Sequence, residues 1–322
     1  MRGLLLLAIA LLALPAFGQA GRPVIGYLGA ETPQAFEGRL RAFRQGLAEV
    51  NYIEGRNVQV EYRWAHADNA RLPLLAQELV QKGAAVLVAP GSTAAAVAAK
   101  KATSTIPIVF AVSVDPVEAG LVRTMSRPGG NATGITSLNV QIASTRLHLL
   151  SDLVPSAKTF ALLINPANPK NAAAIIDNVQ VAAHAQRLQL QVVRTAGDED
   201  LAVAFDNLAR QQVGGIVIAS DTYFIEHARE LGKLALAKRI AAIHEAREFV
   251  DAGGLASYGS KLAEAHRLAG VYAGRILQGE KPGNLPVQRL SQVELFINQR
   301  TARALGITVP ASLRQRADAV IE

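Results

Sequence analysis

The chain contains no cysteine among its 322 residues. This absence excludes disulfides, thiol nucleophiles, cysteine zinc sites and iron–sulfur clusters. Aromatic residues make up only 5% of the chain, which weakens a sugar-binding interpretation because sugars usually stack on rings. Half of the residues are hydrophobic and 18% are charged, so the chain can bury large cores and is not disordered. Its length is enough for two domains of ordinary size.

The motifs of common enzyme classes are missing as well. His244-Glu245 begins like a zinc-protease helix motif, but Glu248 stands where the second His is required. There is no Gly-x-Ser-x-Gly elbow, no three-glycine dinucleotide fingerprint and no phosphate-loop lysine motif. We therefore expect no catalytic residue, no metal and no cofactor. An exported α/β hydrolase is the less favoured alternative.

The charge pattern does not indicate nucleic-acid binding. The formal net charge is +7, but the basic residues are dispersed, with only short pairs such as Lys100-Lys101 and Lys238-Arg239. Nucleic-acid interfaces need clustered Lys and Arg. The excess positive charge predicts a solvated basic surface, which aids solubility or association with an acidic partner.

The N-terminus has the pattern of an export signal. Arg2 precedes an almost unbroken apolar run from Leu4 to Phe17, and Gly18-Gln19-Ala20 gives the small-x-small pattern of a signal peptidase site. We assign residues 1–20 to a signal peptide and expect a periplasmic mature protein that begins near Gly21. No cysteine follows the run, so we expect no lipid anchor.

Strand and helix patterns alternate along most of the mature chain. Buried or half-buried strands are predicted at 24–28, 58–64, 84–89 and 107–111 in the first half, and at 160–164, 191–194, 215–219 and 241–243 in the second. Amphipathic helices separate them, and a further helix is predicted over 116–125 before the Pro128-Gly129-Gly130 break. Two such runs predict an α/β fold with two doubly wound parallel-sheet lobes.

The C-terminal third predicts a hinge between these lobes. It supplies single elements, including a strand at 255–258, a helix at 262–277 and a strand at 287–297, instead of a third domain. We expect the chain to cross between lobes near residues 131–137, 255–260 and 287–293, which makes a three-strand hinge. Lobe one is then 21–133 plus 259–288, and lobe two is 134–258 plus 289–322.

Candidate ligand-binding residues lie in loops at the carboxyl ends of the strands, where parallel α/β sheets bind ligands. They are Tyr27, Ser92, Thr93, Ser113, Asn165, Asp221, Glu245 and Tyr258. Pro90-Gly91-Ser92-Thr93 offers hydroxyls and helix N–H groups to a carboxylate, whereas Asp221 or Glu245 offers a partner for an ammonium group. Ser92 is equally compatible with a role as a helix N-cap, and for Asp221 the N-cap role is slightly favoured. Tyrosines at such positions are more often ordinary packing residues.

Several strings resemble those of one family. They are IPIVFAVSVDPVEAGLV (106–122), RPGGNATGI (127–135), INPANP (164–169), EFVDAGGLASYG (248–259) and ELFINQRTARALGITVPASLRQRADAVIE (294–322). Together they resemble the substrate-binding proteins of ABC transporters, of the TrpX-like type. The resemblance covers nearly the whole mature chain and implies the type I periplasmic-binding-protein fold.

The resemblance also implies a function. Such proteins close on a small solute and deliver it to an inner-membrane ABC permease, so we expect a monomer that binds a carboxylate-bearing solute such as an amino acid. The carboxylate site maps onto Ser92, Thr93 and Ser113, and the amino-group site onto Asp221 or Glu245. The chain departs from the family at His244-Glu245, where relatives often carry an aromatic residue or proline. A ligand sensor that presents its solute to a membrane receptor is the alternative with the same fold.

Overall fold

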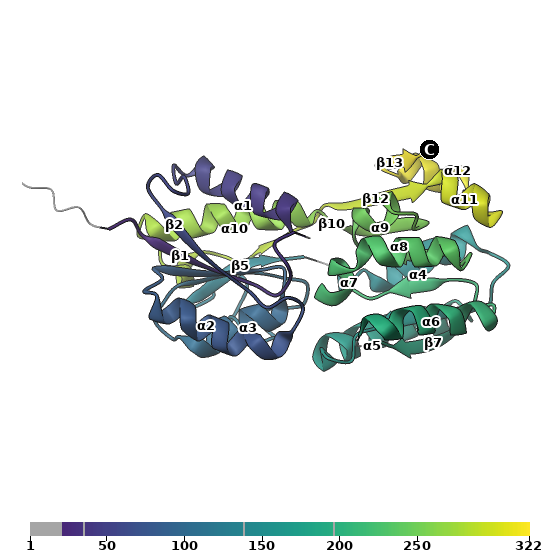
Figure 1. Cartoon of the computed structure of the whole chain (residues 1–322), viewed down its shortest axis with the longest axis horizontal. Helices are drawn as coiled ribbons and strands as arrows, with labels where there is room; N and C mark the ends of the chain where they lie inside the picture. The colour runs from purple at the N-terminus through teal and green to yellow at the C-terminus, as the bar shows by residue number, and fades with distance from the viewer. Residues whose placement is uncertain (1–20, 35, 138, 196) are drawn as a thin grey trace, which may run out of the picture.

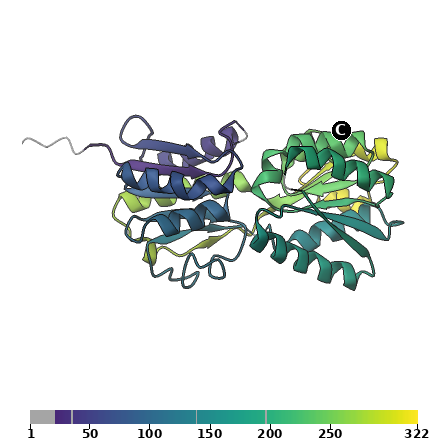
Figure 2. The ribbon, with the colours of Figure 1, turned by 60° about the horizontal axis from the view of Figure 1, so that its bottom comes forward.

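The computed structural model describes residues 21–34, 36–137, 139–195 and 197–322. The predicted signal peptide lies outside these residues. The described chain forms two lobes that lie side by side (Figures 1 and 2), each built around its own sheet. Strand order is β11-β5-β4-β3-β1-β2 in the first sheet and β13-β12-β10-β9-β8-β6-β7 in the second. All the pairings are parallel except that of β10 with β12. The predicted α/β architecture is confirmed.

The first lobe has helices on both faces of its sheet. Its strands are β1 (Val24–Gly29), β2 (Gln59–Trp64), β3 (Val86–Pro90), β4 (Ile108–Val112), β5 (Ala132–Thr136) and β11 (Gln288–Arg289). Its helices are α1 (Glu37–Glu49), α2 (Leu72–Gln81), α3 (Thr93–Ala102) and α10 (Leu262–Leu277), with 3₁₀ turns at Asn69–Arg71 and Pro282–Asn284. Helices α1 and α10 cover one face, and α2 and α3 the other (Figure 1).

The second lobe repeats this layering around a longer sheet. Its strands are β6 (Thr159–Ile164), β7 (Gln189–Arg194), β8 (Ile216–Ile218), β9 (Ala242–His244), β10 (Ala256–Ser260), β12 (Val293–Asn298) and β13 (Ala319–Ile321). Its helices are α4 (Ala143–Leu153), α5 (Pro169–Ala185), α6 (Asp198–Arg210), α7 (Thr222–Glu226), α8 (Ala228–Ala237), α9 (Arg247–Asp251), α11 (Gln299–Leu305) and α12 (Ala311–Arg316). Helix α4 packs against α5, whereas α8 packs against α6 and α9.

Helices α1 and α10 approach each other closely at small residues. A Cβ atom on Gly46 would lie 1.8 Å from the carbonyl oxygen of Arg267, and one on Gly270 would lie 2.2 Å from that of Phe43. Apolar side chains of both helices, such as Phe43 and Tyr272, share a core with β1, β3 and β4. The glycines therefore let α10, which comes from late in the chain, complete the same layer as α1.

The described chain passes between the lobes after β5, after β10 and after β11. Strand β5 lies in the first sheet over its whole length, and β10 lies wholly in the second. We therefore propose lobe limits a few residues later than the sequence pattern suggests: 21–136 plus 262–290, and 143–260 plus 293–322. The strand predicted over 287–297 is two strands, because the chain crosses from β11 in one sheet to β12 in the other.

One predicted helix does not form. Residues 116–125 make turns instead. The Asp115 carboxylate accepts from the N–H of Val117 at 2.7 Å, and the carbonyl oxygen of Pro116 accepts from the N–H of Leu121 at 2.9 Å, outside the helical i→i−4 pattern. Among the helices of the described residues, none is long and apolar enough to cross a membrane.

Candidate ligand-binding site

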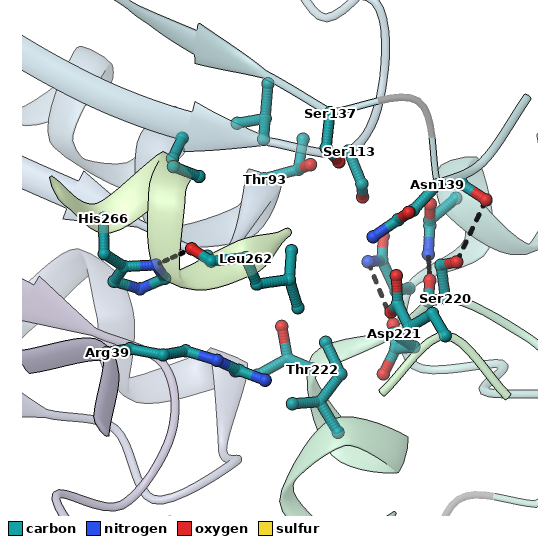
Figure 3. Close-up of a pocket in the computed structure, with 18 residues that line it drawn as sticks. Arg39, Thr93, Ser113, Ser137, Asn139, Ser220, Asp221, Thr222, Leu262 and His266 are labelled. Carbon is teal, nitrogen blue, oxygen red and sulfur yellow. Dashed lines mark hydrogen bonds between the residues drawn. The ribbon is translucent and has the colours of Figure 1, made fainter. Parts of the chain in front are cut away.

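A cavity lies between the lobes, at the carboxyl ends of both sheets (Figure 3). The space open to the centre of a water-sized sphere is about 30 Å³, and all empty space, with the open mouth included, is about 550 Å³. The lobe-one side and the first crossing contribute Arg39, Gly91, Thr93, Ala111, Val112, Ser113, Ser137, Asn139, Leu262, Ala265 and His266. Lobe two contributes Asn168, Asn171, Ser220, Asp221, Thr222, Ile225 and Glu245. A solute in this cavity would contact both lobes.

The predicted site residues fall into three groups. Thr93, Ser113, Asp221 and Glu245 line the cavity. Ser92 and Asn165 lie directly behind its wall, where they bind neighbouring backbone or side chains. Tyr27 and Tyr258 do not line the cavity.

Tyr27 packs inside lobe one instead. Its ring centroid lies 5.3 Å from those of Phe43, Tyr62 and Trp64, and only 1% of the residue is exposed. Tyr258 is half-buried, and its carbonyl oxygen accepts a hydrogen bond from Arg146. Both tyrosines follow the packing alternative that their sequence positions left open.

Ser92 is the N-cap of α3. Its Oγ accepts from the N–H of Ala95 at 3.2 Å, and the residue is buried. This bond satisfies one of the free donors of the helix start. Thr93, the first residue of the helix, carries its hydroxyl to the cavity (Figure 3). Gly91, with φ of +89°, makes the turn that precedes them.

Asp221 is both an N-cap and a wall residue. Its Oδ1 accepts from the N–H of Tyr223 at 3.0 Å and from Nδ2 of Asn165 at 2.8 Å, and its Oδ2 accepts from Nδ2 of Asn168 at 3.3 Å. Burial raises the pKa of Asp221, and these hydrogen bonds oppose the rise. The carboxylate is held in a fixed position at the floor of the cavity.

Glu245 follows β9 and is buried between two arginines. Burial raises the pKa of its carboxyl, while the charges of Arg146 and Arg39 oppose the rise. Its Oε2 is buried without a hydrogen-bond partner in the described residues. Burial also lowers the pKa of the adjacent His244 well below its ordinary value, so that imidazole is neutral. Glu245 therefore offers an acceptor to whatever fills the cavity.

Arg39, which the sequence analysis missed, brings a positive charge into the cavity from α1 (Figure 3). Its guanidinium carbon lies 4.1 Å from the centre of the Phe36 ring, and the residue is 7% exposed. It makes no ion pair or hydrogen bond in the described part of the chain. A signal existed: Arg39 lies on the apolar helix face with Phe36 and Phe43, where a basic residue is out of place.

Glu31 and His266 meet behind Gly91. A Cβ on Gly91 would lie 3.0 Å from Oε1 of Glu31 and 3.5 Å from Nε2 of His266. Burial raises the pKa of Glu31 to about 7 and lowers that of His266 to about 3. Nδ1 of His266 lies 2.9 Å from the carbonyl oxygen of Leu262, which assigns the proton of the neutral ring to Nδ1 and leaves Nε2 as an acceptor.

Asn139 sits on the first crossing. Its Oδ1 accepts from the N–H of Ser260 at 2.7 Å, and its Nδ2 is buried without a hydrogen-bond partner in the described residues. Asn171 lies on the same side of the cavity, because Ser220 contacts both amide residues: Ser220 Oγ donates to the carbonyl oxygen of Asn139 at 3.1 Å, and Asn171 donates from Nδ2 to the carbonyl oxygen of Ser220 at 2.6 Å. The Oδ1 of Asn171 is likewise without a hydrogen-bond partner in the described residues. Each amide is thus fixed by one end and presents the other to the cavity.

Arg146 on α4 holds the crossing segments to the site from behind. It donates from Nε to the carbonyl oxygen of Tyr258 at 2.8 Å, and from Nη2 to the carbonyl oxygen of Asn139 at 2.7 Å and to Oγ of Ser220 at 2.9 Å. The residue is completely buried. It joins the first crossing and strand β10 to one cavity wall.

An outer groove adjoins the cavity and shares Thr93, Asn168 and Asn171 with it. Its other lining residues are Ala94, Val97, Lys101, Val114, Asp115, Glu118, Ala119, Pro169, Lys170 and Ala174. It is more apolar than the cavity but carries lysines from both lobes. No group of His, Asp and Glu in the described residues is arranged to hold a metal ion.

The sequence matches the family described as ABC transporter substrate binding protein over residues 34–321. The chain belongs to this family. The predicted resemblance to the substrate-binding proteins of ABC transporters is thereby confirmed.

Known relatives of this ABC substrate-binding protein agree with the family and the fold. A tyrosine-binding protein of Clostridioides difficile is 28% identical over 267 residues, which cover 83% of this chain and 76% of the relative. A conserved domain protein from Vibrio cholerae has a TM-score of 0.85 at 26% identity, with 93% of this chain and all of that chain covered. An ABC domain in complex with L-Trp from Streptococcus pneumoniae has a TM-score of 0.84 at 24% identity, with 94% and 100% covered.

Proposed function

We propose that the protein is the periplasmic solute-binding component of an ABC uptake transporter and that it closes on a small carboxylate-bearing solute, an amino acid or a related compound. The observation that carries this proposal is the distribution of charge across the cavity. Arg39 extends from lobe one, whereas Asp221 and Glu245 extend from lobe two. A molecule with a carboxylate and an ammonium group matches both walls.

Closure follows from binding that favours one conformation. Open and closed forms interconvert about the crossings, and a solute that contacts both walls stabilises the closed form. A shift from mostly open to mostly closed needs roughly 5 kcal/mol of preference for the closed form. The solute contacts Arg39 and Thr93 on one side and Asp221 on the other. Because the open form separates the two sides, the solute can make both sets of contacts only in the closed form, which supplies this preference.

The family supports the proposed partner and location. A substrate-binding protein of an ABC transporter hands its solute to a membrane permease, and the export signal at residues 1–20 would direct the chain to the periplasm. We propose that the mature chain begins near Gly21 and acts as a monomer. Mass spectrometry of the protein recovered from a periplasmic extract would test the cleavage site.

The functional test uses purified residues 21–322. Thermal unfolding is measured with each common L-amino acid and with small dicarboxylates, sugars and amines, because a ligand that binds the folded state raises its stability. Isothermal titration calorimetry then gives Kd for each stabilising compound. We expect at least one amino acid or related carboxylate to bind. Binding confined to sugars or to amines without a carboxylate would contradict the proposal.

A further inference from the structure

The cavity wall contains polar atoms that the protein itself does not satisfy. In the described residues, Ser137 Oγ, Asn139 Nδ2, Asn171 Oδ1, Glu245 Oε2 and His266 Nε2 are buried without a hydrogen-bond partner. All five residues line the cavity. A buried polar atom that is left unpaired costs about 1–3 kcal/mol. A ligand that pairs with several of these atoms removes that cost and therefore binds more tightly.

These atoms define a pattern of donors and acceptors. Asn171 Oδ1, Glu245 Oε2 and the Nε2 of neutral His266 are acceptors, so they require donors on the ligand. Asn139 Nδ2 is a donor, and the Arg39 guanidinium adds further donors with a positive charge, so these two require acceptors. The ligand must therefore carry hydrogen-bonding groups along most of its surface.

The charges around the cavity balance when the buried carboxyl of Glu31, behind Gly91, carries a proton, which burial favours by raising its pKa to about 7. Arg39 and the completely buried Arg146 are positive, whereas Asp221 and Glu245 are negative. The charges of both arginines act on Glu245. A ligand with a net charge would upset this balance in a site that is largely shielded from water, whereas a zwitterion without net charge preserves it.

The cavity also lacks a surface on which an aromatic ring would stack. Its apolar lining residues are Ala111, Val112, Ile225, Leu262 and Ala265, and the one ring among the described lining residues is the imidazole of His266. The aromatic cluster of Tyr27, Tyr62 and Trp64 lies on β1 and β2, away from the cavity. An indole or phenol placed here would cover the unpartnered polar atoms without pairing with most of them.

We propose that the solute is a small zwitterion with an uncharged polar side group, of the serine, threonine, asparagine or glutamine type, and that Arg39 binds its carboxylate. The inference rests on the proposed function and narrows its solute class. It separates this chain from the relatives whose names state tyrosine and tryptophan. The polar side group pairs with Asn139 and Asn171, and the ammonium group lies near Asp221 and Glu245.

Calorimetry with residues 21–322 tests the solute class. Serine, threonine, asparagine and glutamine are compared with tryptophan, tyrosine, glutamate and lysine at one pH and salt concentration. We expect one of the first four to bind at least about tenfold more tightly than each of the second four, which corresponds to one satisfied polar contact. Tighter binding of tryptophan or tyrosine would overturn this inference and leave the proposed function standing. If none of the amino acids or related carboxylates binds, both are overturned.

Arg39→Gln tests the carboxylate contact, with Arg41→Gln as its matched control. Arg41 lies on the same helix but is exposed, and among the described residues it pairs with Glu37 across 3.9 Å. We expect Arg39→Gln to weaken binding of the best polar amino acid at least about tenfold, and Arg41→Gln to leave it unchanged. The matching amine without a carboxylate, titrated into both variants, is the second readout. An equal loss for amine and amino acid, or no loss for either, would show that Arg39 does not hold the carboxylate.

Discussion

Thr32 of lobe one donates its backbone N–H to Oε2 of Glu226 in lobe two at 3.0 Å. The Thr32 hydroxyl also donates to Oε1 of the same carboxylate. Thr32 lies in the loop after β1, and Glu226 ends α7, so both bonds span the cleft. In the closing motion proposed above, these bonds form only when the lobes come together, so they stabilise the closed form by contacts that involve no solute.

Replacing Glu226 with alanine is expected to weaken solute binding. The variant loses charge-assisted hydrogen bonds between the lobes, each worth about 1.5–3 kcal/mol in net stability when buried. Because the pair is part-buried, we expect a loss of roughly three- to tenfold in affinity, measured by calorimetry. Glu230→Ala, an exposed carboxylate on the next helix, is the control. An unchanged Kd for Glu226→Ala would show that closure does not depend on this contact.

Stability should depend on pH through Glu31. Burial raises its pKa from 4.5 to about 7, with Arg39 opposing the rise and Glu226 adding to it. The folded state therefore binds the proton more tightly than the unfolded state does, so this group lowers the free energy of unfolding as pH rises from about 4.5 to 7, by about 3 kcal/mol in all. Above pH 7 the full decrease in the free energy of unfolding is present, and below pH 4.5 there is no decrease.

Glu31→Gln removes this titration. We expect the variant and the wild type to have similar stability at pH 4.5 and the variant to be more stable at pH 8, in urea denaturation followed by circular dichroism. The neighbouring His266, whose pKa burial lowers to about 3, titrates with the opposite sign in both proteins and cancels in the difference. A difference that does not change with pH would contradict the assignment to Glu31.

The glycines between α1 and α10 give a test of packing. Gly270→Ala places a methyl group against the Phe43 backbone, where its carbon would lie 2.2 Å from the carbonyl oxygen. We expect the free energy of unfolding to fall by about 3 kcal/mol, because the two helices must move apart. Gly38→Ala on α1 meets nothing within 4 Å, and the same measurement should show a gain of roughly 0.5–1 kcal/mol. Equal effects at both positions would argue against the close approach.

Arg146→Lys should destabilise the protein although the charge is kept. Lysine cannot reproduce the forked contacts to the carbonyl oxygens of Tyr258 and Asn139 and to Ser220. We expect a loss of about 2–3 kcal/mol in the free energy of unfolding. Arg229→Lys on the exposed side of α8 should change it by less than about 0.5 kcal/mol. Similar stability of the two variants would mean that Arg146 does not hold the crossings.

The alternation of apolar strands and amphipathic helices was enough to predict both lobes. The spacing of apolar residues within each element indicates both its type and the face that it buries. The helix predicted over 116–125 was wrong because its apolar spacing gave no sign that Asp115 and Pro116 would fix turns. Side-chain direction was the other difficulty. Tyr27 lies near a strand end, but its ring points to the sheet face covered by α1 and α10.

The site was only partly predictable for a different reason. Thr93, Ser113, Asp221 and Glu245 follow strands, so the position of each could be read locally. Arg39 enters from the middle of the amphipathic face of α1, and Asn139 from a crossing. The position of Arg39 on an apolar helix face marks it as unusual, but its role and that of Asn139 depend on how the two lobes meet, which the local sequence does not show.

The late arrival of α10 has a consequence for biosynthesis. This helix supplies Leu268, Ala269 and Tyr272 to the layer that α1 begins, so the ribosome must complete nearly the whole polypeptide before the N-terminal lobe has its full core. Until residue 277 has emerged, one face of the first sheet is only half covered. The first lobe therefore lacks part of its core for most of its synthesis and can complete its folding only near the end of translation.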